Sequence, residues 1–391
     1  MTRSENKLAV VVFQLGGPDS LQAVEPFLCN LFSDPDIIDF PFARLARPTL
    51  ARLISSRRAR HVQEHYASIG GKSPIRELTE LQARALEREL RDSRGLDARV
   101  FVAMRYWHPL TGEAAAQIGR GDFRELILLP LYPQFSKTTT GSSLNEWQRQ
   151  YARTGKDSLR SNVVHSFYDS PTYLDAVVEK INEGLARFIL ATDPPVAAVH
   201  NRPADVILSP SVADEESAFR PAPDQLQALR GVYPEQSERA HGDKSRRSQS
   251  GATDDVHLVF SAHGVPVRVI EAGDPYQQQI EATVRLVMER GGWRNPHALC
   301  YQSRVSPGKW LEPTLSETLR GLAVRGGSRV LVIPISFVTD HVETLAEIDI
   351  EARELARHLG IAQFELMPAL NDSPTFIRAL ADLVLAQLRA H

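Results

Sequence analysis

The amino-acid sequence predicts a doubly wound α/β fold arranged as two related lobes. Three observations support this prediction: short apolar runs rich in β-branched residues, helical patterns between them, and an order of strand ends that occurs twice. Continuously apolar runs are typical of parallel strands that are covered on both faces. Strands that alternate with helices imply right-handed crossover connections within a parallel sheet.

Seven apolar runs are predicted to be buried parallel strands. They are Leu8–Leu15, Arg99–Met104, Glu125–Leu131, His257–Ala262, Ala298–Tyr301, Arg329–Ile335 and Gln363–Met367. Helical periodicity occurs between many of them, at Ile75–Arg91, Tyr173–Leu190, Tyr276–Glu289, Leu311–Val324 and Glu343–Leu359. This alternation is the pattern expected of repeated strand–helix–strand units.

Three segments of the first half have counterparts in the same order in the second half. The pairs are VVFQLGGP with LVFSAHGVP, MRYWHP with CYQSRVSP, and LILLPLY with VLVIPIS. A single match would mean little, because Gly and Pro commonly follow strands. Three matches in register favour two related lobes.

A polar segment separates the two halves. We expect an N-terminal lobe over 7–168, a C-terminal lobe over 169–366, and a helix over 367–391 that packs back on the lobes. Within the second lobe, 193–255 is predicted to be a mostly disordered insertion, with an isolated strand considered at Ala204–Leu208. Its later part has almost no large apolar residues, so it cannot bury enough surface to offset the entropy of ordering.

Composition excludes several classes of protein. The 391 residues carry a formal charge of −3, from 45 basic and 48 acidic side chains, which gives no general attraction to nucleic acid. Two cysteines, Cys29 and Cys300, are too few for a disulfide framework or for the four thiolates of an iron–sulfur cluster. Neither a signal peptide nor an apolar run of membrane-spanning length is found, so the cytoplasm is the expected location.

The residues at the carboxyl ends of the predicted strands are the first candidates for a site, because ligands of open parallel sheets bind there. They are Leu15, Arg105, Tyr106, Tyr132, Ser136, His263, Gln302, Ser303 and Phe337. Most are aromatic, apolar or hydrogen-bonding, and acids are few. This composition favours a flat, largely apolar ligand that carries anionic groups.

His263 directly follows an apolar strand, and Gly264 and Pro266 turn the chain away from it. A histidine here can act as a base or a metal ligand, because its unperturbed pKa of about 6.5 lies close to neutral pH. The alternative is a histidine that only hydrogen-bonds a loop.

An acidic helix is predicted after Asp340. Asp340 and Glu343 have the spacing of a capping box, and Glu343, Glu347 and Glu351 follow at four-residue intervals on one helix face. The row can lead protons or cations to a site at the helix start, or it can be a solvated stripe that complements the helix dipole. The first interpretation is favoured for Glu343, and the second for Glu351.

Two further segments can meet anionic groups. Pro130–Ser143 offers hydroxyls and a glycine ahead of a helix, which suits either an anion-binding loop or an ordinary N-cap cluster. Phe42–Arg60 is basic and amphipathic, which suits a membrane surface, a ligand carboxylate, or simply a helix with a solvated cationic face.

Taken together, these residues resemble the ferrochelatase family from about Leu8 to Leu388, outside Thr192–Asp255. The resemblance includes QLGGPDS, RRARHVQEHYASIGGKSPI, MRYWHPLT, LPLYPQFSKTTTGSS, FSAHGVP, GDPY, YQSRVSP and FVTDHVETLAEID. FVTDHVETLAEID and SAHGVP are the specific motifs, and the others add order and spacing.

The resemblance implies two Rossmann-like lobes with four-stranded parallel sheets, of chelatase type, that enclose a porphyrin cleft. It implies a lyase that inserts ferrous iron into a porphyrin, the last step of haem synthesis. His263 and Glu343 would face each other across the ring as the catalytic and metal-binding pair. A neutral imidazole can accept a proton or bind Fe(II), and so can a carboxylate, so the division of roles stays open.

The resemblance also implies the residues that surround the pair. Leu15, Tyr66, Tyr132, Trp310 and Phe337 would hold the macrocycle, Arg57, Arg58 and Ser136 would meet its propionates, and Arg105, Gln302 and Ser303 are further substrate-binding candidates. Asp340, His341 and Glu347 would support the pair, with Glu347 on a proton or metal path.

Two departures from the family pattern refine these expectations. Lys137 stands where some members have a cluster-binding cysteine, and the C-terminus has none, so we expect no [2Fe–2S] cluster and no permanently bound cofactor. Leu15 stands where members that act on coproporphyrin tend to have tyrosine, which favours protoporphyrin IX.

Other functions and several properties stay open at this point. The alternatives are a coproporphyrin ferrochelatase, another tetrapyrrole metal chelatase, and a non-catalytic haem or metal carrier. The expected partners are porphyrin and ferrous iron, without nucleic acid. We also consider peripheral contact with the inner membrane through Phe42–Arg60. The oligomeric state is expected to be a monomer or a homodimer.

Overall fold

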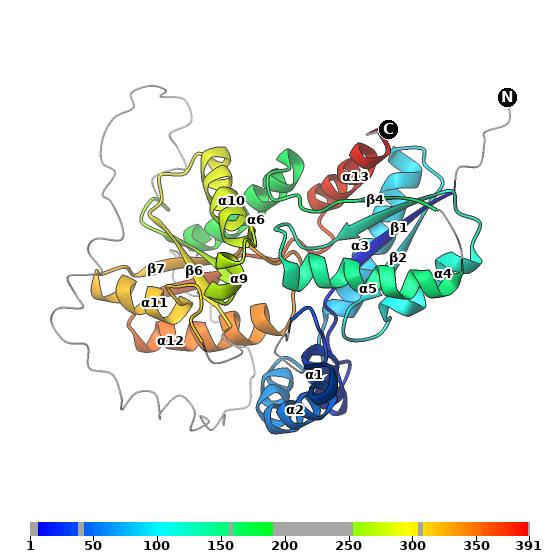
Figure 1. Cartoon of the computed structure of the whole chain (residues 1–391). Helices are drawn as coiled ribbons and strands as arrows, with labels where there is room; N and C mark the ends of the chain where they lie inside the picture. The colour runs from blue at the N-terminus through cyan, green and yellow to red at the C-terminus, as the bar shows by residue number, and fades with distance from the viewer. Residues whose placement is uncertain (1–6, 38–42, 156–158, 191–252, 304–307, 390–391) are drawn as a thin grey trace. The chain divides into compact units, whose positions relative to one another are not determined.

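The computed structural model describes residues 7–37, 43–155, 159–190, 253–303 and 308–389. Its first half contains a parallel four-stranded sheet in the order β2-β1-β3-β4 (Figure 1). The strands are β1 (Leu8–Gln14), β2 (Ala98–Met104), β3 (Glu125–Pro130) and β4 (Arg160–Val163). Every residue of the central strand β1 is buried. This burial explains its uninterrupted apolar sequence.

The second half repeats the arrangement. Its sheet is also parallel, in the order β6-β5-β7-β8, with strands β5 (His257–His263), β6 (His297–Gln302), β7 (Arg329–Pro334) and β8 (Gln363–Leu366). The two related four-stranded sheets and the seven predicted strands are therefore confirmed, with bounds that differ by one or two residues. Strand β4 was missed because its sequence, RSNV, is short, polar and partly exposed.

Helices connect the strands of both sheets. They are α1 (Val24–Phe32), α2 (Ala43–Ser68), α3 (Ile75–Arg88), α4 (Thr111–Arg120), α5 (Ser142–Tyr151), α6 (Pro171–Leu190), α9 (Val267–Glu271), α10 (Tyr276–Gly291), α11 (Leu315–Val324), α12 (Arg353–His358) and α13 (Pro374–Arg389). The helix predicted from Leu311 begins only at Leu315. Pro313 has no N–H to donate, and Thr314 with Glu317 forms the capping box that starts α11.

The acidic segment differs in helix type from the prediction. An α-helix was expected over Glu343–Leu359, but residues Glu343–Ala352 form a π-helix, and α12 follows it directly. Most π-helical segments are single turns at functional sites. At ten residues, this π-helix is longer than a single turn, and its length marks the segment as a candidate functional site.

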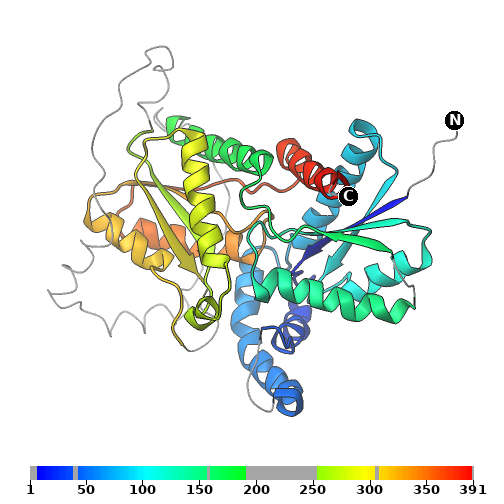
Figure 2. The same ribbon diagram turned by 45° about the horizontal axis from the view of Figure 1, so that its top comes forward.

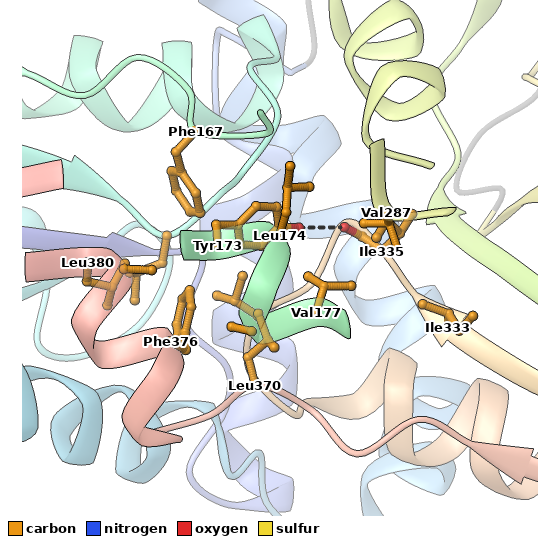
Figure 3. Close-up of a cluster of buried hydrophobic side chains, with 14 of the residues drawn as sticks. Phe167, Tyr173, Leu174, Val177, Val287, Ile333, Ile335, Leu370, Phe376 and Leu380 are labelled. Atoms are coloured by element: carbon orange, nitrogen blue, oxygen red, sulfur yellow. Dashed lines mark hydrogen bonds between the residues drawn. The ribbon is translucent and has the colours of Figure 1, made fainter. Parts of the chain in front are cut away.

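One hydrophobic core extends over both sheets. It joins side chains of β1 and β3 to those of β5 and β7, together with α6, α10 and α13. Figure 3 shows Tyr173 and Phe376 within this cluster, and the Tyr173 hydroxyl donates to the Ile335 carbonyl at 3.4 Å. Because packed interiors resist deformation, this core keeps the strand ends in fixed positions.

Helices α1 and α2 lie side by side, as Figures 1 and 2 show. Val24, Leu28 and Phe32 of α1 pack against Ala51 and Tyr66 of α2. The basic stretch predicted over Phe42–Arg60 lies within α2, except that Phe42 is outside the described residues. Contact of this stretch with a membrane stays a prediction.

Some predictions from the sequence are not tested by the described residues. The predicted insertion 193–255 lies outside the described residues, including Ala204–Leu208, except for 253–255, which lead into β5. The lobe boundaries at 7–168, 169–366 and 367–391 also stay predictions. None of the helices in the described ranges combines the length and apolar character that crossing a membrane requires.

Candidate active site

Strand β5 positions His263 at its last residue. The backbone N–H of His263 donates to Ser336 Oγ at 3.0 Å, and the Tyr276 hydroxyl donates to the His263 carbonyl at 3.0 Å. A Cβ on Gly264 would lie 2.7 Å from the Gln302 carbonyl oxygen. Only glycine therefore allows the chain to turn this closely past β6 after the histidine.

His263 forms a hydrogen-bonded pair with Glu343, the first residue of the π-helix. His263 Nδ1 lies 2.9 Å from Glu343 Oε2, and the side chains are 32% and 18% exposed. Burial by itself would lower the pKa of His263, but the charge and the hydrogen bond of Glu343, together with the charge of Glu347, outweigh burial and raise it. Burial by itself would raise the pKa of Glu343, but His263 lowers it overall. Each partner thus stabilises the charged form of the other.

Ser303 links Glu343 to the next carboxylate of the row. Its hydroxyl lies 3.1 Å from Glu343 Oε2 and 2.6 Å from Glu347 Oε2. A hydroxyl carries one proton, so both contacts are hydrogen bonds only when a carboxyl group supplies the second proton. Burial, and then repulsion from Glu343, raises the pKa of Glu347. Glu347 is therefore the carboxyl group that keeps a proton more readily.

This raised pKa makes a prediction for stability. A carboxyl group whose pKa is higher in the folded than in the unfolded state favours folding at low pH, and this contribution is lost as pH rises through the folded pKa. Glu347→Gln should therefore raise the melting temperature, relative to wild type, more at pH 8 than at pH 5. One pKa unit corresponds to about 1 kcal/mol, and we expect at least that difference in ΔΔG between the two pH values.

The matched control is Glu289→Gln on the surface of α10, where Glu289 accepts from Arg285, a partner that stays charged at both pH values. Its effect on the melting temperature should be nearly the same at both pH values. Thermal unfolding of both variants at pH 5 and pH 8 makes the comparison. An effect of Glu347→Gln that is equal at both pH values, or larger at pH 5, would contradict the raised pKa.

His341 and Phe337 lie beside the pair. The Phe337 ring centroid is 4.4 Å from that of His341 and 6.4 Å from that of His263. His341 Nδ1 is 3.1 Å from the Thr339 carbonyl oxygen, and burial lowers its pKa. Its Nε2 is buried without a hydrogen-bond partner among the described residues and lies 3.9 Å from Glu343 Oε1. His341 is thus a neutral imidazole with an open nitrogen next to the pair.

Gln302 and Trp310 lie close to the turn that follows His263. The Ser261 hydroxyl donates to Gln302 Oε1 at 2.6 Å, whereas Gln302 Nε2 is buried with no hydrogen-bond partner in the described part of the chain. Trp310 is buried and forms an isolated antiparallel bridge with Pro266. Their roles in binding a substrate stay predictions.

The strand ends of the first sheet place Leu15 next to Tyr106, the residue after Arg105. The Leu15 carbonyl accepts from the Tyr106 N–H at 3.0 Å. The Arg105 side chain, 11% exposed, binds the buried Asp34 carboxylate at 2.9 Å and the Ser142 hydroxyl at 2.8 Å. Tyr106 also donates to Asp34, at 2.6 Å. Arg105 therefore has a buried counterion that sequence patterns did not indicate.

Tyr132 and Ser136 follow β3. The Tyr132 hydroxyl lies 3.4 Å from Ser143 Oγ, and both residues are buried. Ser136 donates to the buried Asp274 carboxylate at 3.0 Å and accepts from the Thr138 N–H, as an N-cap residue does. The N-cap interpretation of this loop is thus observed, and anion binding by Ser136 stays a prediction.

Helix α2 brings Tyr66 near the pair. Tyr66 is buried, and after burial itself the charges of Glu343 and Glu347 contribute most to raising its pKa. Arg58 lies over the Phe32 ring at 5.7 Å, and Arg57 is exposed. The structure therefore brings Tyr66 to the pair, and contacts of the two arginines with propionates stay predictions.

The outer end of the acidic row is exposed. Glu351 is 53% exposed and lies 3.0 Å from His65 Nε2. The hydrogen bond that His65 donates to Glu351 raises the pKa of His65 despite burial. This surface ion pair agrees with the interpretation that we favoured for Glu351.

The predicted capping box between Asp340 and Glu343 is wrong. The Asp340 carboxylate accepts from the Thr344 hydroxyl at 3.1 Å and from the Asn371 amide at 3.0 Å. The π-helix has Val342 as its N-cap residue, with no side-chain cap hydrogen bond found in the described structure. Glu343 binds His263 instead, because a hydrogen bond between charged groups is stronger than one to a neutral N–H.

Four residues that hold the site were not assigned a role from the sequence: Asp34, Tyr276, Ser336 and Asn371. Tyr276 lies in the quoted GDPY motif and Ser336 ends the quoted VLVIPIS segment, but neither pattern indicated a role at the site. The others act through contacts between segments far apart in the chain, and such contacts leave no local pattern.

The fold and the site define an α/β protein with two related parallel sheets and, at a strand end, a partly buried histidine–carboxylate pair suited to proton transfer. A family model described as Ferrochelatase matches residues 7–213 and 231–388. The chain belongs to the ferrochelatase family, and it is therefore a lyase of haem biosynthesis that inserts metal into a porphyrin. The match includes 192–213 and 231–255, which we wrongly expected to lie outside the likeness.

Curated relatives are similar along almost the whole chain. The ferrochelatase of Geotalea daltonii is 44% identical over 378 residues, which are 97% of each chain. That of Synechococcus elongatus is 43% identical over 380 residues, or 97% of this chain and 82% of the relative. That of Nostoc punctiforme is 40% identical over 385 residues, or 98% and 83%.

Likeness to solved structures is weaker. One of them, the terminal enzyme for biosynthesis of siroheme in denitrifying bacteria, has a TM-score of 0.41 at 11% identity and covers 97% of this chain and 98% of its own. A likeness at this level carries no argument about function.

Proposed function

We propose that this enzyme inserts Fe(II) into protoporphyrin IX to give protohaem, with His263 and Glu343 as the catalytic, metal-binding pair. The observation that carries the proposal is the 2.9 Å contact between His263 Nδ1 and Glu343 Oε2 at the end of β5. Insertion replaces two pyrrole protons with one iron ion, so the site has to accept two protons and bind a divalent cation.

The geometry of the pair suits proton removal. Because Nδ1 faces the carboxylate, Nε2 of His263 is the nitrogen left for the substrate. A neutral imidazole accepts a pyrrole proton at Nε2, and the adjacent carboxylate stabilises the imidazolium that forms. Glu343 and His341 offer oxygen and nitrogen atoms that are suitable ligands for Fe(II) as it loses water.

A route for the released protons starts at the same carboxylate. The Ser303 hydroxyl lies within hydrogen-bonding distance of both Glu343 and Glu347. The raised pKa of Glu347 lets it hold a proton closer to neutral pH than an ordinary glutamate does. We therefore propose Glu347 as the next proton carrier after Glu343. A non-catalytic carrier would not need such a route.

The proposed porphyrin site combines apolar and cationic side chains from both halves of the chain. Leu15, Tyr66, Tyr132, Trp310 and Phe337 would contact the macrocycle, and Arg57, Arg58, Arg105, Ser136 and Gln302 would meet its polar groups. Leu15 at the end of β1 is the residue that favours protoporphyrin, because an apolar side chain there suits the less carboxylated porphyrin.

We also propose that the enzyme works without an iron–sulfur cluster. The chain has two cysteines, and the Cys300 thiol is buried in β6, where burial raises its pKa to about 12. Lys137, in the loop where some members have a cysteine, donates to the Ala272 carbonyl at 3.1 Å. Peripheral membrane contact would use α2, where Leu53 and the nearby arginines are exposed.

The test is anaerobic insertion of Fe(II), followed by absorbance, with protoporphyrin IX and coproporphyrin III in parallel. We expect kcat/KM to be about tenfold or more in favour of protoporphyrin, the discrimination that a modest difference in pocket contacts provides. Faster coproporphyrin turnover would overturn the substrate assignment. Faster insertion of Co(II) or Ni(II) would indicate another chelatase, and stoichiometric binding without insertion would indicate a carrier.

A further inference from the structure

The segment before the π-helix is held by Asn371, from the connection between β8 and α13. Asn371 Oδ1 accepts from the Asp340 backbone N–H at 3.1 Å, and its Nδ2 donates to the Asp340 carboxylate at 3.0 Å. The other Asp340 oxygen accepts from the Thr344 hydroxyl at 3.1 Å. Thr344 directly follows Glu343, so this chain of hydrogen bonds restrains the turn that carries Glu343.

A buried side chain from the first half of the molecule completes the network. Gln82 of α3 has no exposed surface. Its Nε2 donates to the Asn371 carbonyl at 2.9 Å and to Thr339 Oγ1 at 3.0 Å, and its Oε1 accepts from Thr339 Oγ1 at 3.2 Å. A buried carboxamide that makes all these bonds ties Thr339 and Asn371 to one rigid helix.

Backbone strain points to the same segment. Within the described residues, the non-glycine residues with positive φ are Ser303, at 63°, and Asn371, at 39°. Ser303 binds Glu343 and Glu347, and Asn371 binds Asp340, so both hold the acidic π-helix. Non-glycine residues at positive φ persist when surrounding contacts enforce them, and they concentrate at functional sites.

We infer that Gln82 and Asn371 are positioning residues, which act through Asp340 to hold Glu343 against His263. This inference rests on the catalytic role proposed above for Glu343. The Glu343 side chain reaches His263 Nδ1 only if the first π-helical turn keeps its orientation. Residues that orient a metal-binding side chain typically contribute 10- to 100-fold to activity.

The decisive variant is Asn371→Gly. Glycine adopts positive φ without strain, so this change removes the side-chain hydrogen bonds to Asp340 and leaves the backbone conformation accessible. We expect kcat for Fe(II) insertion to fall about 10- to 100-fold. KM for protoporphyrin, and its Kd from fluorescence quenching, should stay within about twofold. Within the described residues the hydrogen bonds of Asn371 connect it to Asp340, Gln82 and Val338, which are not among the proposed macrocycle contacts.

A second variant, Gln82→Met, keeps the length of the side chain and removes its hydrogen bonds. We expect the same separation, a lower kcat with little change in KM. If Gln82→Met does not fold, Asn371→Gly still decides the question, because Asn371 is only half-buried and glycine adopts its positive φ without strain.

Asn295→Ala is the matched control. Asn295 is also a buried amide, and it donates to the Thr253 and Val256 carbonyls at the end of β5 opposite His263. We expect its melting temperature to fall while kcat stays within about twofold. The positioning role is overturned if Asn371→Gly, like Asn295→Ala, lowers only the melting temperature. It is also overturned if Asn371→Gly and Asn295→Ala lower kcat equally.

The variant His263→Ala tests the catalytic pair separately from the positioning network. Full activity of His263→Ala would reject the proposed pair itself. Loss of activity in His263→Ala together with normal kcat in Asn371→Gly would reject only the positioning network.

Discussion

Replacing His263 with alanine is expected to abolish iron insertion, with a fall in kcat of about 10³-fold or more. Proton transfer by a positioned side chain contributes 10²- to 10⁴-fold, and this histidine is also proposed to bind the metal. The end of β5 and the bonds from Tyr276 and to Ser336 set the position of this histidine. Absorbance-monitored conversion of protoporphyrin and Fe(II) to haem measures the effect.

The matched control for this substitution is His257→Ala. His257 begins the same strand and lies at the end opposite to the proposed site. The His257→Ala variant should insert iron at a rate within about twofold of wild type. Both His257→Ala and His263→Ala should still bind protoporphyrin in a fluorescence titration. Full activity in His263→Ala would remove the histidine from the mechanism.

Glu343→Gln is expected to lower kcat by at least about 10²-fold, near the lower end of positioned acid–base effects. Glutamine keeps the shape of the side chain but loses the negative charge. The pKa of His263 is then no longer raised by a neighbouring anion, and neither the imidazolium nor an incoming Fe(II) is stabilised. The link through Ser303 to Glu347 also loses a proton acceptor. Initial rates over a range of Fe(II) concentrations measure the effect.

Glu354→Gln, on the surface of α12, is the control for charge loss on the same continuous helix. Its kcat should remain within about twofold of wild type. Near-normal turnover in Glu343→Gln would reject the assignment of Glu343, whatever the result for His263.

The sequence alone was sufficient for the architecture. Seven of the eight strands could be predicted, because parallel strands covered on both faces have to be apolar along their length, as β1 and β5 are. The same physics explains the failure at β4, which is short and partly exposed. The paired strand ends of the two halves predicted two related lobes, and the two sheets indeed share one strand order.

The sequence also placed the two main residues of the site. His263 was expected at the carboxyl end of a buried strand, and Glu343 at the start of an acidic helix. The interpretation as a catalytic pair came from the family motifs that contain them. The resemblance implied that the two side chains face each other across the porphyrin ring, and this expectation is wrong for the structure, because a direct contact of 2.9 Å leaves no room for a ring between them.

Only the tertiary structure decided how the acidic helix is built and held. The capping-box pattern at Asp340 suggested an ordinary α-helix, but Asn371 and Thr344 occupy the Asp340 carboxylate, and the segment forms a π-helix. Gln82 is 257 residues away from Thr339 in the chain, yet the two hydrogen-bond inside the core. Local patterns report how a segment folds with its neighbours in sequence. Charge pairing, strain and buried amide contacts depend on segments that meet only after the two sheets have packed.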